Sequence, residues 1–422
     1  MNCAQGQETH QYDSSMGKEC TANFSPDENM KFDFDVTVDR SETSSEKWCY
    51  PSLDLASSPV REKPIPMWVA DMDFRAPPVV LEALADAVSH GVFGYSYVGK
   101  AYTDSVINWQ QNRFNWTVDP TWVLQTAGVV AALSQIIRAF TVEGDGVLMQ
   151  MPVYGRFHKT PRTTGRVVVN APLMENGSEY LFDPGVFEAV IKEHAPKLFI
   201  LCHPHNPVGK VWTEDELRTM GEICIRHNVL VVSDEIHQDL VFNRKKKHIP
   251  FASLGEKFAQ NSITCTAPSK TFNLAGLQVS NLFVPNLLLR ERLSRELDAN
   301  GNHGVNTLGM VACEAAYRHG VPWLESLLEY IEGNHQYFAT QIHQHIPNLK
   351  LFNADALYLA WLDCRGLKMN DKELNEFMLH EAKVWFDSGV KFGAGGEGFM
   401  RVNLGCTRAT LSDAVSRMKS VI

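Results

Sequence analysis

The sequence lacks any apolar run approaching the roughly 18 residues that a membrane-spanning helix needs. It is also short of positive charge, because 39 lysines and arginines face 49 aspartates and glutamates, for a net charge of -10. A nucleic-acid-binding protein needs a basic face, and the one notable basic run, residues 245–247, fits a solvated loop. We therefore expect neither a membrane nor a nucleic acid among the partners.

Cysteine occurs nine times, an odd number, at scattered positions with no CxxC pair. Such a set is typical of a reducing compartment rather than of a disulfide framework. Residues 1–30 are polar and lack both the apolar core of a signal peptide and the arginine-rich pattern of a transit peptide. We expect a flexible N-terminal extension over residues 1–30 and a cytoplasmic protein.

Common site motifs are missing or misplaced. The sequence has no Walker motif and no GxSxG. The run GAGGEG, residues 393–398, matches GxGxxG, but a strand-like run follows it where a dinucleotide-binding loop would open a helix. His203 and His205 stand beside prolines with no third ligand at zinc spacing. We expect neither a nicotinamide cofactor nor a metal.

The length of 422 residues favours two domains. Apolar strands alternate with amphipathic helices, one of which begins at a capping box of Thr213 and Glu216. This alternation is typical of an α/β protein with a mostly parallel sheet flanked by helices. The strands are expected at 146–151, 197–202, 229–236, 262–267, 281–285, 356–363 and 399–405. The predicted domains are a large one, 76–320, and a smaller α+β domain of 31–75 with 321–422.

Ligands in such sheets sit at the carboxyl ends of the strands, where the segments HPHNPVG, SDEIH and APSKT fall. The last contains Lys270 between a serine and a threonine, with little other charge nearby. A lysine there is either a surface residue or an amine that forms a Schiff base with an aldehyde cofactor, and pyridoxal 5′-phosphate is such a cofactor. Asp234 is well placed to pair with its pyridinium nitrogen, although a helix-capping aspartate is the alternative.

Other residues in the same order fit the same cofactor. Asn206 could hold its phenolic oxygen, and Gly128-Val129-Val130 offers backbone N–H groups at a helix start for its phosphate. Tyr154 could stack on the ring, although a core tyrosine is the common alternative. Arg401, a single arginine in an apolar strand, favours binding of an anion.

This order of residues resembles the fold-type I, class I/II aminotransferase-like pyridoxal-phosphate enzymes. Longer phrases, among them PMWVADMDF, HPHNPVGKVW, SDEIHQDLVF, APSKTFNLAG and GEGFMRVNLGC, resemble the cystathionine β-lyase/cystalysin-type C–S lyase branch. The resemblance covers about residues 31–422. It implies an aspartate-aminotransferase-like fold and a homodimer with shared active sites.

The resemblance also implies a role for each matching residue. Lys270 carries the cofactor and later removes the α-proton of the substrate, Asp234 pairs with the ring nitrogen, and Arg401 binds the substrate carboxylate. His237 lies beside Asn206 at the 3′-oxygen. The phosphate is bound by the Val129 and Val130 amides, by Ser269 and by Tyr95 of the other subunit.

The sequence departs from the superfamily pattern on both sides of the lysine. The usual serine three residues before it and the basic residue eight after it are replaced by Ala267 and Gln278. Ser269 or Thr266 is therefore expected to contribute to the phosphate site. Leu357 stands where relatives often have threonine, which reshapes the substrate pocket.

We expect an enzyme that catalyses β-elimination, cleaving cystathionine or another cysteine S-conjugate to a thiol, pyruvate and ammonia. An aminotransferase with the same cofactor site is the closest alternative. A specialised biosynthetic C–S lyase and a regulatory protein on this fold also remain open. The sequence does not name the thiol that leaves.

Overall fold

The computed structural model describes residues 32–49, 63–302 and 304–422, and the predicted extension over residues 1–30 lies outside them. The strands are β1 (Ile65–Pro66), β2 (Val123–Thr126), β3 (Gly146–Met149), β4 (Val167–Asn170), β5 (Met174–Glu175), β6 (Tyr180–Leu181), β7 (Leu198–Cys202), β8 (Leu230–Asp234), β9 (Ser262–Thr266), β10 (Ser280–Phe283), β11 (Lys350–Leu351), β12 (Leu359–Asp363), β13 (Val384–Trp385), β14 (Asp387–Ser388) and β15 (Phe399–Asn403).

The helices are α1 (Pro78–His90), α2 (Lys100–Phe114), α3 (Val129–Phe140), α4 (Gly155–Thr163), α5 (Pro184–His194), α6 (Glu214–Arg226), α7 (Glu256–Ala259), α8 (Pro268–Thr271), α9 (Leu287–Ala299), α10 (Thr307–His319), α11 (Val321–His345), α12 (Asp371–Glu376) and α13 (Arg408–Lys419). Short 3₁₀ or π segments occur at Pro120–Trp122, Phe251–Leu254, Ala275–Leu277, Arg365–Leu367, Phe377–Glu381 and Gly389–Phe392.

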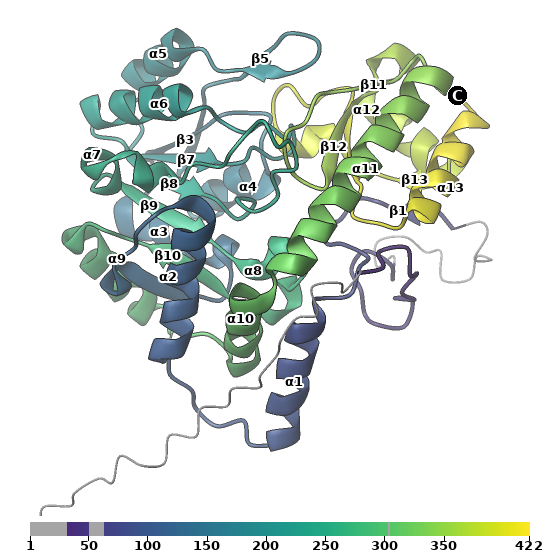
Figure 1. Cartoon of the computed structure of the whole chain (residues 1–422). Coiled ribbons are helices and arrows are strands. Elements are labelled where there is room, and N and C mark those ends of the chain that lie inside the picture. The colour runs from purple at the N-terminus through teal and green to yellow at the C-terminus, as the bar shows by residue number, and fades with distance from the viewer. Residues whose placement is uncertain (1–31, 50–62, 303) are drawn as a thin grey trace, which may run out of the picture. The chain divides into compact units, whose positions relative to one another are not determined.

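A seven-stranded sheet, of which β3, β7, β8, β9 and β10 are labelled in Figure 1, has the order β2-β10-β9-β8-β7-β3-β4. Neighbouring strands from β9 to β4 run parallel. β10 runs antiparallel to both of its neighbours, β9 and β2. The predicted α/β fold with a mostly parallel sheet is confirmed.

The inner strands of this sheet, β3 and β7 to β10, are buried on both faces because helices cover each side. Successive strand side chains point to opposite faces. Leu148, Phe199 and Leu201 accordingly join the core under α5, α6 and α7. Their neighbours Val147, Leu198 and Ile200 join a second core with residues of α3, α4 and α9. This two-sided burial explains why the strands appear in the sequence as continuous apolar runs.

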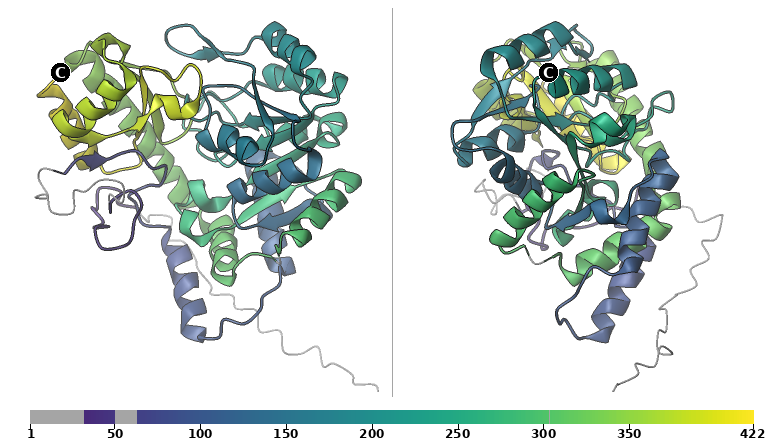
Figure 2. Two further views of the ribbon diagram at one scale, coloured as in Figure 1. Left: turned by 180° about the vertical axis from the view of Figure 1, so that it is seen from behind. Right: turned by 90° about the vertical axis from the view of Figure 1, so that its left-hand side faces the viewer.

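A smaller four-stranded sheet has the order β11-β12-β15-β14, with antiparallel neighbours. It packs with α13 and the second half of the 25-residue helix α11 around a core that contains Phe338, Leu362 and Met400. The first half of α11 reaches the larger sheet's neighbourhood, where Trp323 packs against Phe272 just after α8. The views in Figure 1 and Figure 2 show α11 running between the two regions.

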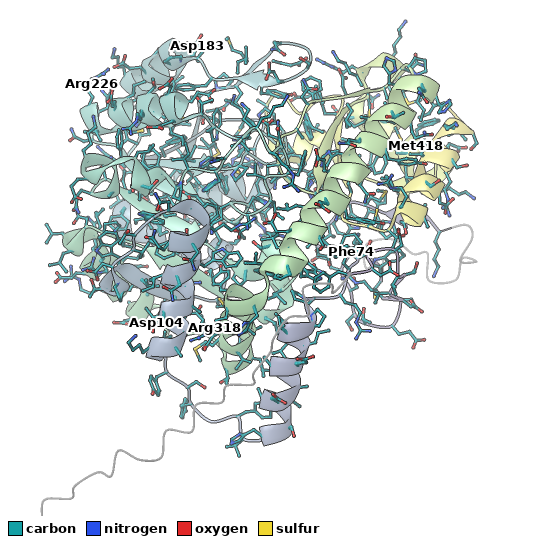
Figure 3. All side chains as sticks on the ribbon, viewed as in Figure 1. Phe74, Asp104, Asp183, Arg226, Arg318 and Met418 are labelled. Atoms are coloured by element: carbon teal, nitrogen blue, oxygen red, sulfur yellow. The ribbon has the colours of Figure 1, made fainter. Side chains whose placement is uncertain are left out.

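Local signals in the sequence act as expected. Thr213 and Glu216 form the predicted capping box, with a hydrogen bond in each direction, at the start of α6. The GAGGEG run forms a turn that leads into the strand β15 and opens no helix, as expected from the sequence. Phe74, labelled near α11 in Figure 3, packs edge-on against Tyr330 of that helix. No helix in the described part of the chain has the length and apolar character that crossing a membrane requires.

Candidate active site

The candidate site forms at the carboxyl ends of β7, β8 and β9. These three strands are parallel neighbours, and Asp234, the last residue of β8, lies between Cys202 of β7 and Cys265 of β9. Because parallel strands end at the same edge of a sheet, the segments that follow them meet there. Asn206 follows β7 and Lys270 follows β9, so the three residues are brought together as predicted.

Lys270 lies in the short helix α8, and its Nζ donates a 2.7 Å hydrogen bond to the carbonyl oxygen of Ala70. Burial lowers the pKa of the Lys270 amine from 10.5 to about 8. The charge of Arg401 contributes to this lowering, whereas Asp71 and Asp234 oppose it. A substantial fraction of the amine is therefore neutral near pH 8, as a nucleophile or a base must be.

Asp234 is a buried carboxylate that accepts a hydrogen bond from the Ile236 amide at 3.1 Å. Burial, with a smaller contribution from the charge of Glu235, raises its pKa from 3.8 to about 7. The Ile236 amide and Lys270 oppose this shift. A cationic N–H beside this carboxylate would offset the cost of its burial.

Arg401 lies in the middle of β15 and is 3% exposed. Its Nη2 contacts the carbonyl oxygen of Trp68 at 2.8 Å and a carboxylate oxygen of Asp387 at 3.0 Å, and its Nη1 lies 3.4 Å from Oδ1 of Asn206. Among the described residues, Nε has no hydrogen-bond partner. The guanidinium therefore has donor capacity left for a ligand carboxylate.

Tyr154 and His237 belong to the same site as Asn206, Lys270 and Arg401. The Tyr154 amide donates to the carbonyl of Asn206 at 3.0 Å, just before α4. Burial raises the pKa of the Tyr154 phenol, which the charge of Arg401 opposes. Burial lowers the pKa of His237 well below its usual value, as do the charges of Lys270 and Arg401. The imidazole is therefore neutral, and its Nδ1 finds no hydrogen-bond partner in the described part of the chain.

The start of α3 is an open helix end. β2 ends at Thr126 and runs parallel to β9, since both are antiparallel to β10, so α3 begins at the same edge of the sheet. Gly128 precedes the helix with φ 116, makes no side-chain cap, and a Cβ placed there would meet no atom within 4 Å. Val129 and Val130 are the first helical residues. The free N–H groups and the open space suit a phosphate.

Ala267 and Gln278 replace the usual phosphate-binding residues, and the structure distinguishes the two residues, Thr266 and Ser269, that were expected to contribute in their place. Ala267 is buried before α8, and Gln278 has a left-handed backbone with φ 48. Thr266 is buried and its hydroxyl donates to the carbonyl of Asn281, at 3.4 Å. Ser269 is half-buried. Of the two candidates, Ser269 is the one that stays accessible to a ligand.

Tyr95 does not join the other predicted residues within this chain. It lies between α1 and α2 and is fully exposed. Its neighbours Val92, Phe93 and Tyr97 are largely exposed. This position does not support a role for Tyr95 in the site of its own chain. The exposed side chain is free to contact another chain, as the resemblance implies.

Sequence reasoning assigned no role at the site to residues 68–74 (WVADMDF), which we name the strap and which contact Lys270 and Arg401. Side chains from distant parts of the chain bind its backbone carbonyls. Arg401 binds Trp68, Lys270 binds Ala70, and Asn403 binds both Val69 and Asp71. Asn273 binds Met72 and Phe74. The phrase PMWVADMDF marked the segment, but backbone acceptors leave no residue-type signal.

A buried polar cluster stands next to Asp234. Glu235 accepts hydrogen bonds from Ser233, from the Phe251 amide and from Nε2 of His248 at 2.8 Å. The ring of His203 stacks on that of His248 at 4.1 Å. Burial lowers the pKa of both imidazoles to about 3 and raises that of Glu235 to about 7. In the described residues, no group of three or more histidine, cysteine or acidic side chains is arranged to hold a metal.

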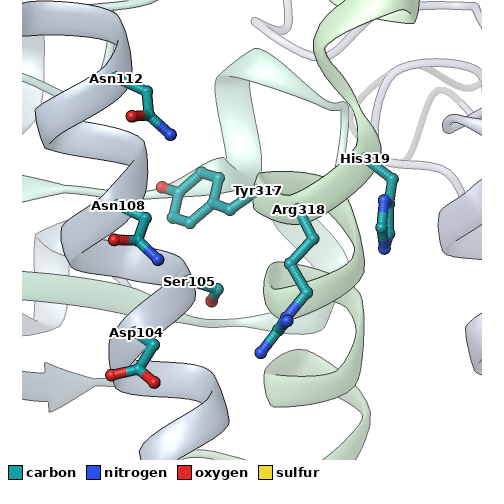
Figure 4. Close-up of a pocket in the computed structure, with 7 residues that line it drawn as sticks. All are labelled: Asp104, Ser105, Asn108, Asn112, Tyr317, Arg318 and His319. Atoms are coloured by element: carbon teal, nitrogen blue, oxygen red, sulfur yellow. The ribbon is translucent and has the colours of Figure 1, made fainter. Parts of the chain in front are cut away.

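Two surface pockets lie away from this constellation. One, of ≈ 320 Å³, lies between α2 and α10, where Asp104, Asn108 and Asn112 face Tyr317 and Arg318 (Figure 4). The other, of ≈ 390 Å³, is lined by residues that include Lys210, Lys246 and Asp355. Neither contains a residue predicted for the cofactor or the substrate.

The chain belongs to the family described as aminotransferase class I and II, which it matches over residues 63–418. It is 43% identical to cystathionine beta-lyase PatB of Bacillus subtilis over 92% of this chain and 99% of that protein. It is 33% identical to protein MalY of Escherichia coli over 93% of this chain and 99% of that protein. The structure of cystalysin from Treponema denticola, which contains pyridoxal 5′-phosphate, superposes with a TM-score of 0.88 at 36% identity, covering 93% of this chain and 98% of that one. The resemblance inferred from the sequence is confirmed.

Proposed function

We propose that this protein is a pyridoxal-phosphate-dependent C–S β-lyase. It cleaves cystathionine or another cysteine S-conjugate to a thiol, pyruvate and ammonia. The observation that carries the proposal is the position of Lys270, which follows β9 beside the strand that ends in Asp234. Its amine, of lowered pKa, interacts electrostatically with both Asp234 and Arg401. The relatives named cystathionine beta-lyase and cystalysin support the same reaction.

The residues at the site fit the cofactor. It combines an anionic phosphate, a protonatable ring nitrogen, a phenolic oxygen and an aldehyde. The start of α3 after Gly128, with Ser269, would hold the phosphate, and Asp234 would pair with the ring nitrogen. Asn206 and the unpaired Nδ1 of His237 would face the phenolic oxygen. Tyr154 would lie against the ring, and Lys270 would bind the aldehyde.

The bound cofactor withdraws electrons from the substrate, which makes the Cα proton acidic and allows the Cβ–S bond to break. Arg401 binds the substrate α-carboxylate and so fixes which Cα bond faces Lys270. The neutral Lys270 amine takes the Cα proton with its lone pair. The thiol leaves from Cβ, and water then releases ammonia and pyruvate, so that one conjugate and one water yield three products.

An aminotransferase would use the same residues and is the second candidate, because the matched family is described as aminotransferase class I and II. The two differ in what happens without a keto acid. A lyase makes pyruvate and thiol in equal amounts at a steady rate, whereas an aminotransferase stops after about one turnover.

The test is purified protein with cystathionine and other cysteine S-conjugates, assayed with and without a keto acid. Borohydride reduction followed by peptide mapping should place the cofactor on Lys270. Turnover that halts and restarts only with a keto acid would replace the lyase by the aminotransferase. Bound cofactor with no reaction of any amino acid would favour a regulatory protein.

We also infer a homodimer with shared sites, a cytoplasmic location and two domains. The exposed Phe93 and Tyr95 support the dimer. Seven described cysteines are free thiols, six of them buried, which suits a reducing compartment. The separate sheets of residues 123–283 and 350–403 support a large domain of 76–320 and a smaller one of 31–75 with 321–422.

A further inference from the structure

The Ala70 carbonyl of the strap receives two hydrogen bonds. The Lys270 amine donates one at 2.7 Å, and the phenolic hydroxyl of Tyr358 donates the other at 2.9 Å. Tyr358 is 1% exposed and lies directly before β12. The hydroxyl therefore contacts the same oxygen atom as the candidate base.

Tyr358 is held in place through its backbone. The Leu404 amide donates to its carbonyl at 2.7 Å. The preceding residue, Leu357, has φ 77, a left-handed conformation that is costly for leucine. The Leu357 amide bonds to the carbonyl of Leu240, and its own carbonyl contacts Nε2 of His335. These hydrogen bonds hold the strained backbone in place and so fix the position of the Tyr358 Cα and Cβ atoms.

The acceptor is fixed as well. Asn403 binds the carbonyls on either side of Ala70, those of Val69 and Asp71. The Ala70 oxygen therefore cannot turn without breaking contacts on both sides. A carbonyl has two lone-pair directions, and the Tyr358 hydroxyl occupies one of them.

We propose that Tyr358 is a positioning residue that confines the free Lys270 amine to one side of the Ala70 carbonyl. With one N–H committed to that oxygen, the amine keeps its lone pair available in a restricted set of directions. The proposal rests on the proposed role of Lys270 as the base that removes the Cα proton. Tyr358 itself exchanges no proton with the substrate.

The hydroxyl acts through geometry and not through charge. Burial raises the pKa of the Tyr358 phenol far above its usual value, so the group stays a neutral donor. The charged groups that face Lys270 are Arg401, Asp71 and Asp234, and a Tyr358→Phe change removes none of them.

The test is Tyr358→Phe in the full-length holoenzyme, assayed with a cysteine S-conjugate that carries hydrogen or deuterium at Cα. We expect kcat to fall about tenfold with KM within twofold of the parent, because a misplaced base slows the chemical step and leaves carboxylate binding intact. The kinetic isotope effect on kcat should increase, because proton removal becomes slower than the other steps.

Tyr180→Phe is the matched control. Its hydroxyl is buried, contacts the carbonyl of Gly395 and the indole of Trp361, and lies outside the Lys270 constellation. This variant should keep the parent's kcat and isotope effect. The isotope effect is a ratio, so it stays interpretable even if part of a variant is unfolded.

The outcomes separate the proposals. An unchanged kcat and isotope effect in Tyr358→Phe would overturn the positioning role, as would a raised KM without a larger isotope effect. A loss far beyond a hundredfold would make Tyr358 a reacting group, which also overturns it. Failure of the parent enzyme to form pyruvate would instead reject the proposed function.

Discussion

Asp387 and Arg401 face each other in neighbouring antiparallel strands, and the guanidinium of Arg401 lies 3.0 Å from the Asp387 carboxylate. The other oxygen of that carboxylate contacts the Lys391 ammonium at 2.8 Å. Asp387 therefore keeps a cationic partner when Arg401 is removed. This relationship makes substitution of Arg401 a clean test, because it does not strand a buried charge.

Arg401→Ala should raise KM for a cysteine S-conjugate about tenfold to a hundredfold, since hydrogen bonds to a charged group contribute about 1.5–3 kcal/mol. We expect a smaller decrease in kcat, from poorer orientation. Steady-state kinetics measure both values. Arg365→Ala, which removes an arginine paired with Asp363 and Glu175 outside the site, is the control. An unchanged KM in Arg401→Ala would assign Arg401 to structure alone.

Asp234→Asn should retain the cofactor but reduce turnover by at least two orders of magnitude, because a neutral amide stabilises positive charge on the ring nitrogen poorly. Absorbance reports cofactor content, and pyruvate release reports turnover. The Asn side chain can still accept the hydrogen bond from Ile236, so the local backbone should persist. Near-normal turnover would mean that Asp234 is not the partner of the ring nitrogen.

The same substitution has a predictable effect on stability without cofactor. Since the pKa of Asp234 rises from 3.8 to about 7 on folding, the folded protein binds the proton more tightly than the unfolded chain. The stability that Asp234 contributes is present below about pH 4 and is lost as pH rises towards 7. Asp234→Asn should therefore become more stable than the parent as pH rises from 5 to 8, measured by urea unfolding. If the parent instead became more stable relative to the variant between pH 5 and 8, the raised pKa assigned to Asp234 would be wrong.

Phe93→Asp should convert a dimer into a monomer and abolish most activity, because it places a charge in the exposed apolar segment that contains Tyr95. Light scattering under assay conditions measures the mass. Leu288→Asp, at an exposed position near the start of α9, is the matched control and should remain dimeric. A fully active monomer of the parent protein would reject the shared site.

The sequence predicted the elements whose signals are local. Strands β7, β8 and β9 were predicted at nearly their observed bounds because their apolar runs are continuous, and Lys270 and Asp234 followed from their places at strand ends. Strand β2 was missed, since three of its four residues are only half-buried and it carries no comparable run. The Glu235–His248 pair and the two donors on Ala70 were missed because they depend on tertiary packing. The roles of the site residues remain predictions for the experiments above.

The strap ties together parts of the chain that are made at very different times. Asn403 contacts Val69 across 334 residues of sequence, Arg401 contacts Trp68 across 333, and Lys270 contacts Ala70 across 200. During synthesis, residues 68–74 leave the ribosome long before any of these partners exist, and non-local contacts of this kind form late. The larger sheet can assemble once β10 has emerged, and Lys270 and Asn273 can then bind the strap, but its contacts with Arg401 and Asn403 form only after β15 follows. A nascent chain halted before Phe399 would therefore contain Lys270 and Asp234 but neither Arg401 nor Asn403, so the candidate site is complete only after β15 has been made.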